Sequence, residues 1–209
     1  MSEVKTIEIS RELLDSAYNY EEYRAMIEKL LSAGKTTGEN HSEGMLHYTR
    51  MNIHRMNRQD KNVSLSENLK QRLEQVERPM VWLILTEAWC GDAAQLIPVI
   101  QKMADSSGKI EAKYILRDEH LELMDRFLTN GKSRSIPKLI CMDAETLELL
   151  GDWGARPKEA QVLFESLSNT KGIASQEVAE RLHKWYAEDK TVSMQKEFLP
   201  ILDQWEKSK

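Results

Sequence analysis

One cysteine, Cys90, lies where an apolar run ends and a helical pattern begins, within the segment 81–93. This position places the thiol at the junction between a strand and the N-terminus of a helix. Backbone N–H groups and the helix dipole there favour a negative charge, so a cysteine at that point tends to ionise and react. The sequence therefore predicts that Cys90 is a nucleophile. The alternative is an unreactive small residue at the start of a helix.

The residues beside Cys90 act on its pKa and on its surroundings. The carboxylate of Asp92 would raise the pKa of the thiol by like-charge repulsion and so oppose the helix dipole. Asp92 could instead cap the helix through its own side chain. Glu87 and Trp89 flank the thiol, and we expect both to shape the surface that a substrate meets.

The second cysteine, Cys141, has no chemical role in this prediction. It lies four residues along a strand from Pro137, which places it about 13 Å from the edge of the site at about 3.3 Å per residue. A disulfide requires Cα atoms within about 7 Å. We therefore expect no disulfide between Cys90 and Cys141, and we expect Cys141 to be a buried core thiol.

Histidines and arginines make residues 41–61 locally basic. His47 and His54 are seven residues apart, so they share one face of a helix. Arg50 and Met51 occupy the places between them, and neither is a typical metal ligand. We therefore expect no metal site in this chain.

The simplest interpretation of the basic helix, from His47 to Lys61, is a solvated face. A sharper hypothesis is that this helix, whose arginines are Arg50, Arg55 and Arg58, covers the Cys90 site and offers cations to a thiolate or to an anionic thiol cofactor. Further along the chain, residues 118–120 read Asp-Glu-His, which we interpret as a helix start rather than a catalytic group.

The composition indicates a soluble globular protein, since 41% of the 209 residues are hydrophobic and 30% are charged. The net charge of -5 gives no general attraction to nucleic acid, and two cysteines cannot form a disulfide framework. The first residues show no apolar signal core, and no apolar run approaches the roughly 18 residues of a membrane span. We expect a cytoplasmic, reducing location without membrane contact.

The chain divides into three parts: a helical extension at 1–78, an α/β domain at 79–170 and a second helical extension at 171–209. Apolar spacing in the first part predicts three helices, one of which is capped by Ser66. The last part predicts two helices whose apolar faces pack on the domain, or alternatively bind a partner. These five helices are Tyr20–Leu31, Ser42–Asn62, Ser66 to before Pro79, Ser175–Glu188 and Val192–Glu206, the last with a possible kink at Pro200.

Between these extensions, strands and helices alternate. The first strand is apolar almost throughout, as a centrally placed strand should be, and the helix after it is clearly amphipathic. The predicted strands are Met80–Thr86, Ile110–Leu116, Pro137–Met142 and Thr146–Leu150, and the predicted helices are Asp92–Ser107, Glu119–Thr129 and Pro157–Ser168.

This order of elements, together with the sequence Trp89-Cys90-Gly91, resembles the thioredoxins, whose active site reads Trp-Cys-Gly-x-Cys. The motif Trp-Cys-Gly-Asp-Ala at residues 89–93, after a long helical segment, resembles that of a group of bacterial thioredoxin-like proteins. Several further residues match thioredoxin positions. The matching residues are Pro98 inside the helix that follows the cysteine, Ile136-Pro137 with its expected cis bond, Gly151, and Gly154-Ala155 at the end of the sheet.

The resemblance implies an α/β thioredoxin-like fold, with a central mixed sheet flanked by helices. It also implies a substrate surface around Cys90 on which the exposed backbone of Ile136 pairs with an extended substrate. The remaining residues expected on that surface are Trp89, Gly91, Asp92, Pro137 and Gly154.

Two departures from the thioredoxin pattern alter the expected chemistry. Ala93 stands where a thioredoxin has its second cysteine, and Ile84 stands where it has a buried aspartate that relays a proton. Without both groups, this protein should not run the two-cysteine cycle by itself.

We therefore predict a single-cysteine thiol–disulfide oxidoreductase. Cys90 would attack a protein disulfide or a mixed disulfide of a small thiol, and an external thiol would resolve the product. No cofactor is expected beyond a low-molecular-weight thiol as co-substrate. The alternative is a redox-inactive thioredoxin-fold module that binds a protein. A third reading, iron–sulfur binding, is weaker, because such proteins carry Cys-Gly-Phe-Ser, whereas residues 90–93 read Cys-Gly-Asp-Ala.

Overall fold

The computed structural model describes residues 9–208, so the start of the chain, where no signal segment is expected, lies outside them. Its centre is a four-stranded sheet in the order β2-β1-β3-β4. The central strand β1 pairs in parallel with β2 and antiparallel with β3, which in turn pairs antiparallel with β4. The strands are β1 (Met80–Thr86), β2 (Ile110–Leu116), β3 (Lys138–Asp143) and β4 (Leu149–Gly154). The predicted mixed sheet is confirmed.

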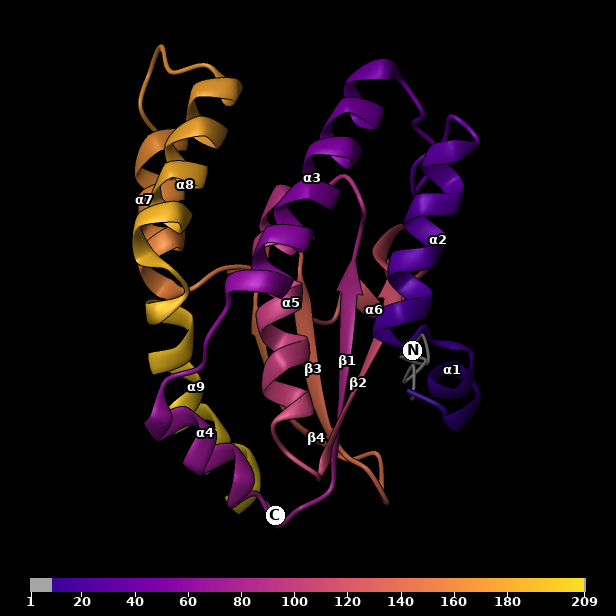
Figure 1. Cartoon of the computed structure of the whole chain (residues 1–209), viewed down its shortest axis with the longest axis vertical. Coiled ribbons are helices and arrows are strands. Elements are labelled where there is room, and N and C mark those ends of the chain that lie inside the picture. The colour runs from indigo at the N-terminus through magenta and orange to yellow at the C-terminus, as the bar shows by residue number, and fades with distance from the viewer. Residues whose placement is uncertain (1–8, 209) are drawn as a thin grey trace, which may run out of the picture.

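The central strand β1 is buried along its whole length, because helices cover both faces of the sheet (Figure 1). Side chains alternate along β1, so Trp82 and Ile84 belong to one core and Leu83 and Leu85 belong to the other. The first core includes α5 (Gly91–Asp105), which follows β1 directly and contains Pro98. The second core includes α1 (Arg11–Ser16) and α6 (Leu121–Met124).

The N-terminal helices pack against the domain and are part of its core. They are α2 (Tyr20–Ser32), α3 (Glu43–Asn62) and α4 (Glu67–Glu74). Their buried faces include Tyr23, Met56 and Leu69, which belong to the same core as Trp82. Figure 1 shows α3 in front of α5, and these two helices are in extensive contact.

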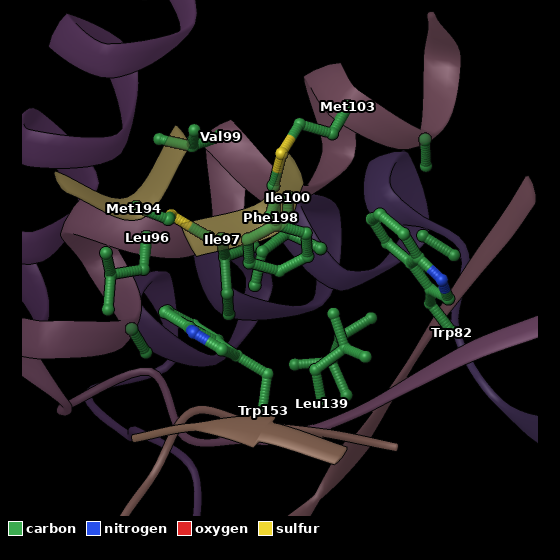
Figure 2. Close-up of a cluster of buried hydrophobic side chains, with 14 of the residues drawn as sticks. Trp82, Leu96, Ile97, Val99, Ile100, Met103, Leu139, Trp153, Met194 and Phe198 are labelled. Atoms are coloured by element: carbon green, nitrogen blue, oxygen red, sulfur yellow. The ribbon is translucent and has the colours of Figure 1, made fainter. Parts of the chain in front are cut away.

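The C-terminal helices also pack on the domain, as their apolar faces predict. The two predicted helices are α8 (Ser175–Asp189) and α9 (Val192–Lys207), and Pro200 lies inside α9 without dividing it. They follow α7 (Lys158–Ser168), the last helix of the α/β domain. Phe198 of α9 lies 5.2 Å from Trp153 and 5.6 Å from Trp82, measured between ring centroids. Figure 2 shows these three rings among the aliphatic side chains of α5.

Two predicted elements are wrong in extent. The fourth strand was expected at Thr146–Leu150 but starts at Leu149, because the Asp143 carboxylate accepts two backbone N–H groups and extends the turn. Gly151 therefore lies within β4 rather than after it.

The predicted helix Glu119–Thr129 is reduced to the 3-10 turn η1 (Arg117–Glu119) and the four residues of α6. Backbone pairing of Thr129 with Ser133 closes a turn where the helix was expected to end. The short helix α1 was not predicted, because six residues are too few to show a helical period.

The aromatic cluster should contribute strongly to stability. Phe198→Ala removes a fully buried ring in contact with Trp82, Trp153 and Trp205, and should lower the free energy of unfolding by about 3–5 kcal/mol in denaturant titrations. Val192→Ala, on the same helix but exposed, should cost no more than about 0.5 kcal/mol. Equal losses in the two variants would contradict the packing of α9 on the sheet.

Candidate active site

Cys90 is the N-cap residue of α5, and its Sγ atom accepts the backbone N–H of Ala93 at 3.4 Å. Cys90 therefore caps the helix itself, and the alternative in which Asp92 provides the cap is wrong. The thiol is partly buried and donates to the backbone carbonyl of Ile136 at 3.3 Å. The cysteine and the Ile136–Pro137 loop thus lie together, as the sequence predicts.

The Ile136–Pro137 peptide bond is cis, and the loop leads directly into β3. Gly154, at the end of β4, supports this loop from behind. Its φ of +118° is a conformation that favours glycine, and a Cβ atom there would lie 2.3 Å from the carbonyl oxygen of Pro137. Gly154 therefore holds the loop in place by allowing a close backbone approach.

Asp92 belongs to a buried network and is only 8% exposed. One carboxylate oxygen pairs with Arg156 Nη2 at 2.6 Å, and the other accepts the Tyr186 hydroxyl at 2.8 Å. Burial raises the pKa of Asp92, while Arg156 and Tyr186 act in the opposite direction. Sequence reasoning missed both partners, since they lie far along the chain and only the fold brings them to Asp92.

This network affects the Cys90 thiol. Burial raises the pKa of Cys90 to about 12, and the negative charge of Asp92 acts in the same direction. The Ala93 N–H and the Arg156 cation act against this rise without cancelling it. The cysteine is therefore a neutral thiol at physiological pH in this structure, and the helix dipole does not dominate.

The basic helix α3 lies over the loop before Cys90, as the sharper hypothesis about it expects. Asn52 donates its amide to the Ala88 carbonyl at 2.9 Å, and Arg55 Nη1 donates to Asn52 Oδ1 at 2.8 Å. Thr37 accepts the Ala88 N–H at 2.9 Å. The loop is thus held from α3 and from the segment before it.

Gly91 provides space for two side chains that come from distant helices. A Cβ atom at this position would lie 2.7 Å from His183 Nε2 and 3.4 Å from Arg55 Nη1. Burial lowers the pKa of His183 to about 4, and the cations of Arg55 and Arg58 act in the same direction, so the imidazole is neutral. Nothing in the sequence pointed to His183, which lies on α8.

Trp89 and Glu87 differ in their environments. Trp89 is partly exposed, and the Arg117 guanidinium lies 5.0 Å from its ring centroid. Glu87 is fully buried, and its carboxylate accepts the Asp118 backbone N–H at 2.9 Å. The expectation that Glu87 shapes the substrate surface is therefore wrong, since its side chain anchors the start of η1.

The remaining cysteine and histidines do not form a second site. Cys141 is fully buried beside Met80, with 3.7 Å between the sulfur atoms, and both cysteines are free. His47 and His54 are exposed. Among residues 9–208, no group of three or more His, Cys, Asp or Glu side chains could hold a metal ion. No helix in this described part is long and apolar enough to span a membrane.

A mixed sheet, a cysteine at the start of the helix after the central strand, and a cis-proline facing that cysteine define a thioredoxin-fold protein. A family model described as thioredoxin matches residues 38–170, so the chain belongs to this thioredoxin family. The match begins before α3 and therefore includes the helix that covers the active-site loop.

Solved structures share the fold. A crystal structure of an HIV epitope scaffold is 17% identical with a TM-score of 0.53, and the alignment covers 92% of this chain and 94% of the scaffold. A protein of unknown function from Pseudomonas aeruginosa is 18% identical with a TM-score of 0.50, and the alignment covers 87% of this chain and 94% of that protein. Comparison with curated proteins finds no match.

Replacing the buried carboxylate should make Cys90 more reactive. Asp92→Asn removes the charge that raises the thiol pKa and leaves Arg156 to lower it. Alkylation by iodoacetamide near neutral pH should become about tenfold faster, because the thiolate fraction rises tenfold for each unit by which the pKa falls. The assay uses the Cys141→Ala background, so that only Cys90 is followed.

The control is Asp105→Asn, which makes the same change on the exposed far end of α5 and should leave the rate unchanged. A thermal unfolding scan shows whether each variant is folded at the assay temperature. An alkylation rate in Asp92→Asn equal to that of the control would mean that Asp92 does not govern the thiol.

Proposed function

We propose that this protein is a single-cysteine thiol–disulfide oxidoreductase that acts through a mixed disulfide at Cys90. One observation carries the proposal: the partly exposed Cys90 thiol lies 3.3 Å from the Ile136 carbonyl, directly before the cis peptide bond of Pro137. This arrangement puts a nucleophile beside a backbone group that can pair with an extended substrate.

The proposed reaction has two exchange steps. The Cys90 thiol loses its proton to solvent or to the leaving sulfur, and its sulfur attacks one sulfur of a substrate disulfide. A Cys90 mixed disulfide forms, the substrate S–S bond breaks, and the other substrate sulfur leaves as a thiol. An external thiol then attacks the mixed disulfide and releases Cys90, because Ala93 provides no sulfur for this step.

Because the pKa of Cys90 is raised, the proposed reaction requires that substrate binding activate the thiol. The hydrogen bond from Sγ to the Ile136 carbonyl stabilises the neutral form of the cysteine. An extended substrate that pairs with Ile136 would donate its own N–H to this carbonyl and remove the thiol's acceptor. The cysteine would thus ionise more readily in the complex than in the free protein.

The proposal is consistent with a bacterial protein of the reducing cytoplasm, where small thiols are abundant enough to resolve the mixed disulfide. The substrate is then a protein disulfide or a mixed disulfide of a small thiol.

A second candidate function is a redox-inactive module that binds a protein through the same groove. The observation in its favour is the pKa of about 12 at Cys90, which leaves very little thiolate near neutral pH. The two candidates differ in one respect, since only the oxidoreductase needs the Cys90 sulfur.

Intact-mass measurements distinguish the oxidoreductase from the redox-inactive binding module. Incubated with hydroxyethyl disulfide, the Cys141→Ala protein should gain one hydroxyethylthio group, and added dithiothreitol should remove it. A Cys90→Ser, Cys141→Ala variant should gain none.

A reduced cysteine peptide serves as the reference for reactivity. If the reference peptide is modified completely by hydroxyethyl disulfide and by a peptide disulfide that can donate an N–H to Ile136, while Cys90 is modified by neither, the oxidoreductase is excluded. A Cys90→Ser variant that still binds its partner would then support the binding module.

A further inference from the structure

A cavity of about 400 Å³ opens beside the active site, between the start of α5 and the helices α7 and α8. Gly91 and Asp92, the two residues after Cys90, form part of its wall. The opposite wall is apolar and includes Phe164, Ile173 and Leu182. Its size is within the range of pockets that hold small ligands.

Arg156 contributes a cation to this cavity, and its side chain is only 9% exposed. The guanidinium lies 3.9 Å from the ring centroid of Phe164, with Nη2 on Asp92 and Nη1 on Gln161. Its Nε atom is buried and has no hydrogen-bond partner among residues 9–208. A buried donor without an acceptor is costly, so an acceptor that reached Nε would be favoured.

Two further cations lie at the Gly91 side of the cavity. Arg55 and the cavity-lining His183 both approach Gly91, and Arg58 contacts Gln95 one turn further along α5. Within the described part of the chain, neither Arg55 nor Arg58 forms an ion pair within 4.0 Å.

The charges around the site therefore do not balance. Arg55, Arg58 and Arg156 provide three positive charges, whereas Asp92 provides one negative charge and already pairs with Arg156. His183 adds no charge, because its imidazole is neutral. This excess of arginines beside Gly91 and Asp92 favours an anion there.

We propose that this cavity binds the carboxylate-bearing part of a small anionic thiol whose sulfur exchanges with Cys90. Arg156 in the cavity wall and Arg55 beside Gly91 would hold its carboxylates, and the apolar wall would contact its carbon chain. The inference rests on the proposed function and deepens it, since it gives the class of external thiol that resolves the mixed disulfide in place of Ala93.

Charge selectivity tests the inference. Cys90 adduct formation is timed by intact mass with dithiodipropionate, which is dianionic, and with hydroxyethyl disulfide, which is neutral. In the Cys141→Ala background, Arg55→Met should lower the ratio of the anionic rate to the neutral rate about tenfold, the value of one charge-assisted hydrogen bond. Arg50→Met changes an exposed arginine on the same helix and should alter the ratio less than about twofold.

A second measurement does not depend on the reactivity of Cys90. S-methylglutathione carries the carboxylates without a reactive sulfur, and its binding is followed by calorimetry. Arg55→Met should weaken this binding about tenfold. No binding to the unaltered protein, or an unchanged charge ratio in Arg55→Met, would overturn the inference. Failure of every disulfide to modify Cys90 would instead reject the proposed function, while S-methylglutathione would still decide whether the cavity binds the anion.

Discussion

Burial of the Asp92 carboxylate next to the Cys90 sulfur determines much of the architecture around the active site. A carboxylate at 8% exposure needs a cation and hydrogen-bond donors, and Arg156 and Tyr186 provide them. Arg156 follows the last strand, while Tyr186 lies on α8. The segment after β4 and helix α8 therefore set the electrostatics around Cys90, and α8 and α9 also complete the core around Trp82.

The buried carboxylate also means that this site differs from that of a thioredoxin in more than the missing second cysteine. Its thiol is neutral at rest, because burial and Asp92 raise the pKa to about 12. Around it, α3 and α8 bring Arg55 and His183 to within reach of Gly91. If the cavity binds an anionic thiol as we propose, that external thiol takes the role that the second active-site cysteine has in a thioredoxin.

The sequence was sufficient for the fold because its signals are local. The apolar strand before Cys90 is a local pattern, and Pro98 and Ile136-Pro137 could be matched to thioredoxin positions. The cis bond at Pro137 was expected from that resemblance, since an X-Pro bond is usually trans. The limits of β4 were wrong because the Asp143 side chain, rather than backbone propensity, sets the turn before it. The partners of Asp92 and the position of His183 depend on tertiary packing across about half the chain, which periodicity does not encode.

A pH titration of Cys90, followed by the chemical shift of its Cβ carbon in Cys141→Ala protein, tests most directly whether the resting thiol is neutral. With a pKa of about 12, the shift should remain that of a neutral thiol from about pH 6 to about pH 10. A titration with a midpoint at or below about 8.5, the value of an ordinary cysteine, would contradict a neutral resting thiol, because neither burial nor Asp92 would then be holding the proton on the sulfur.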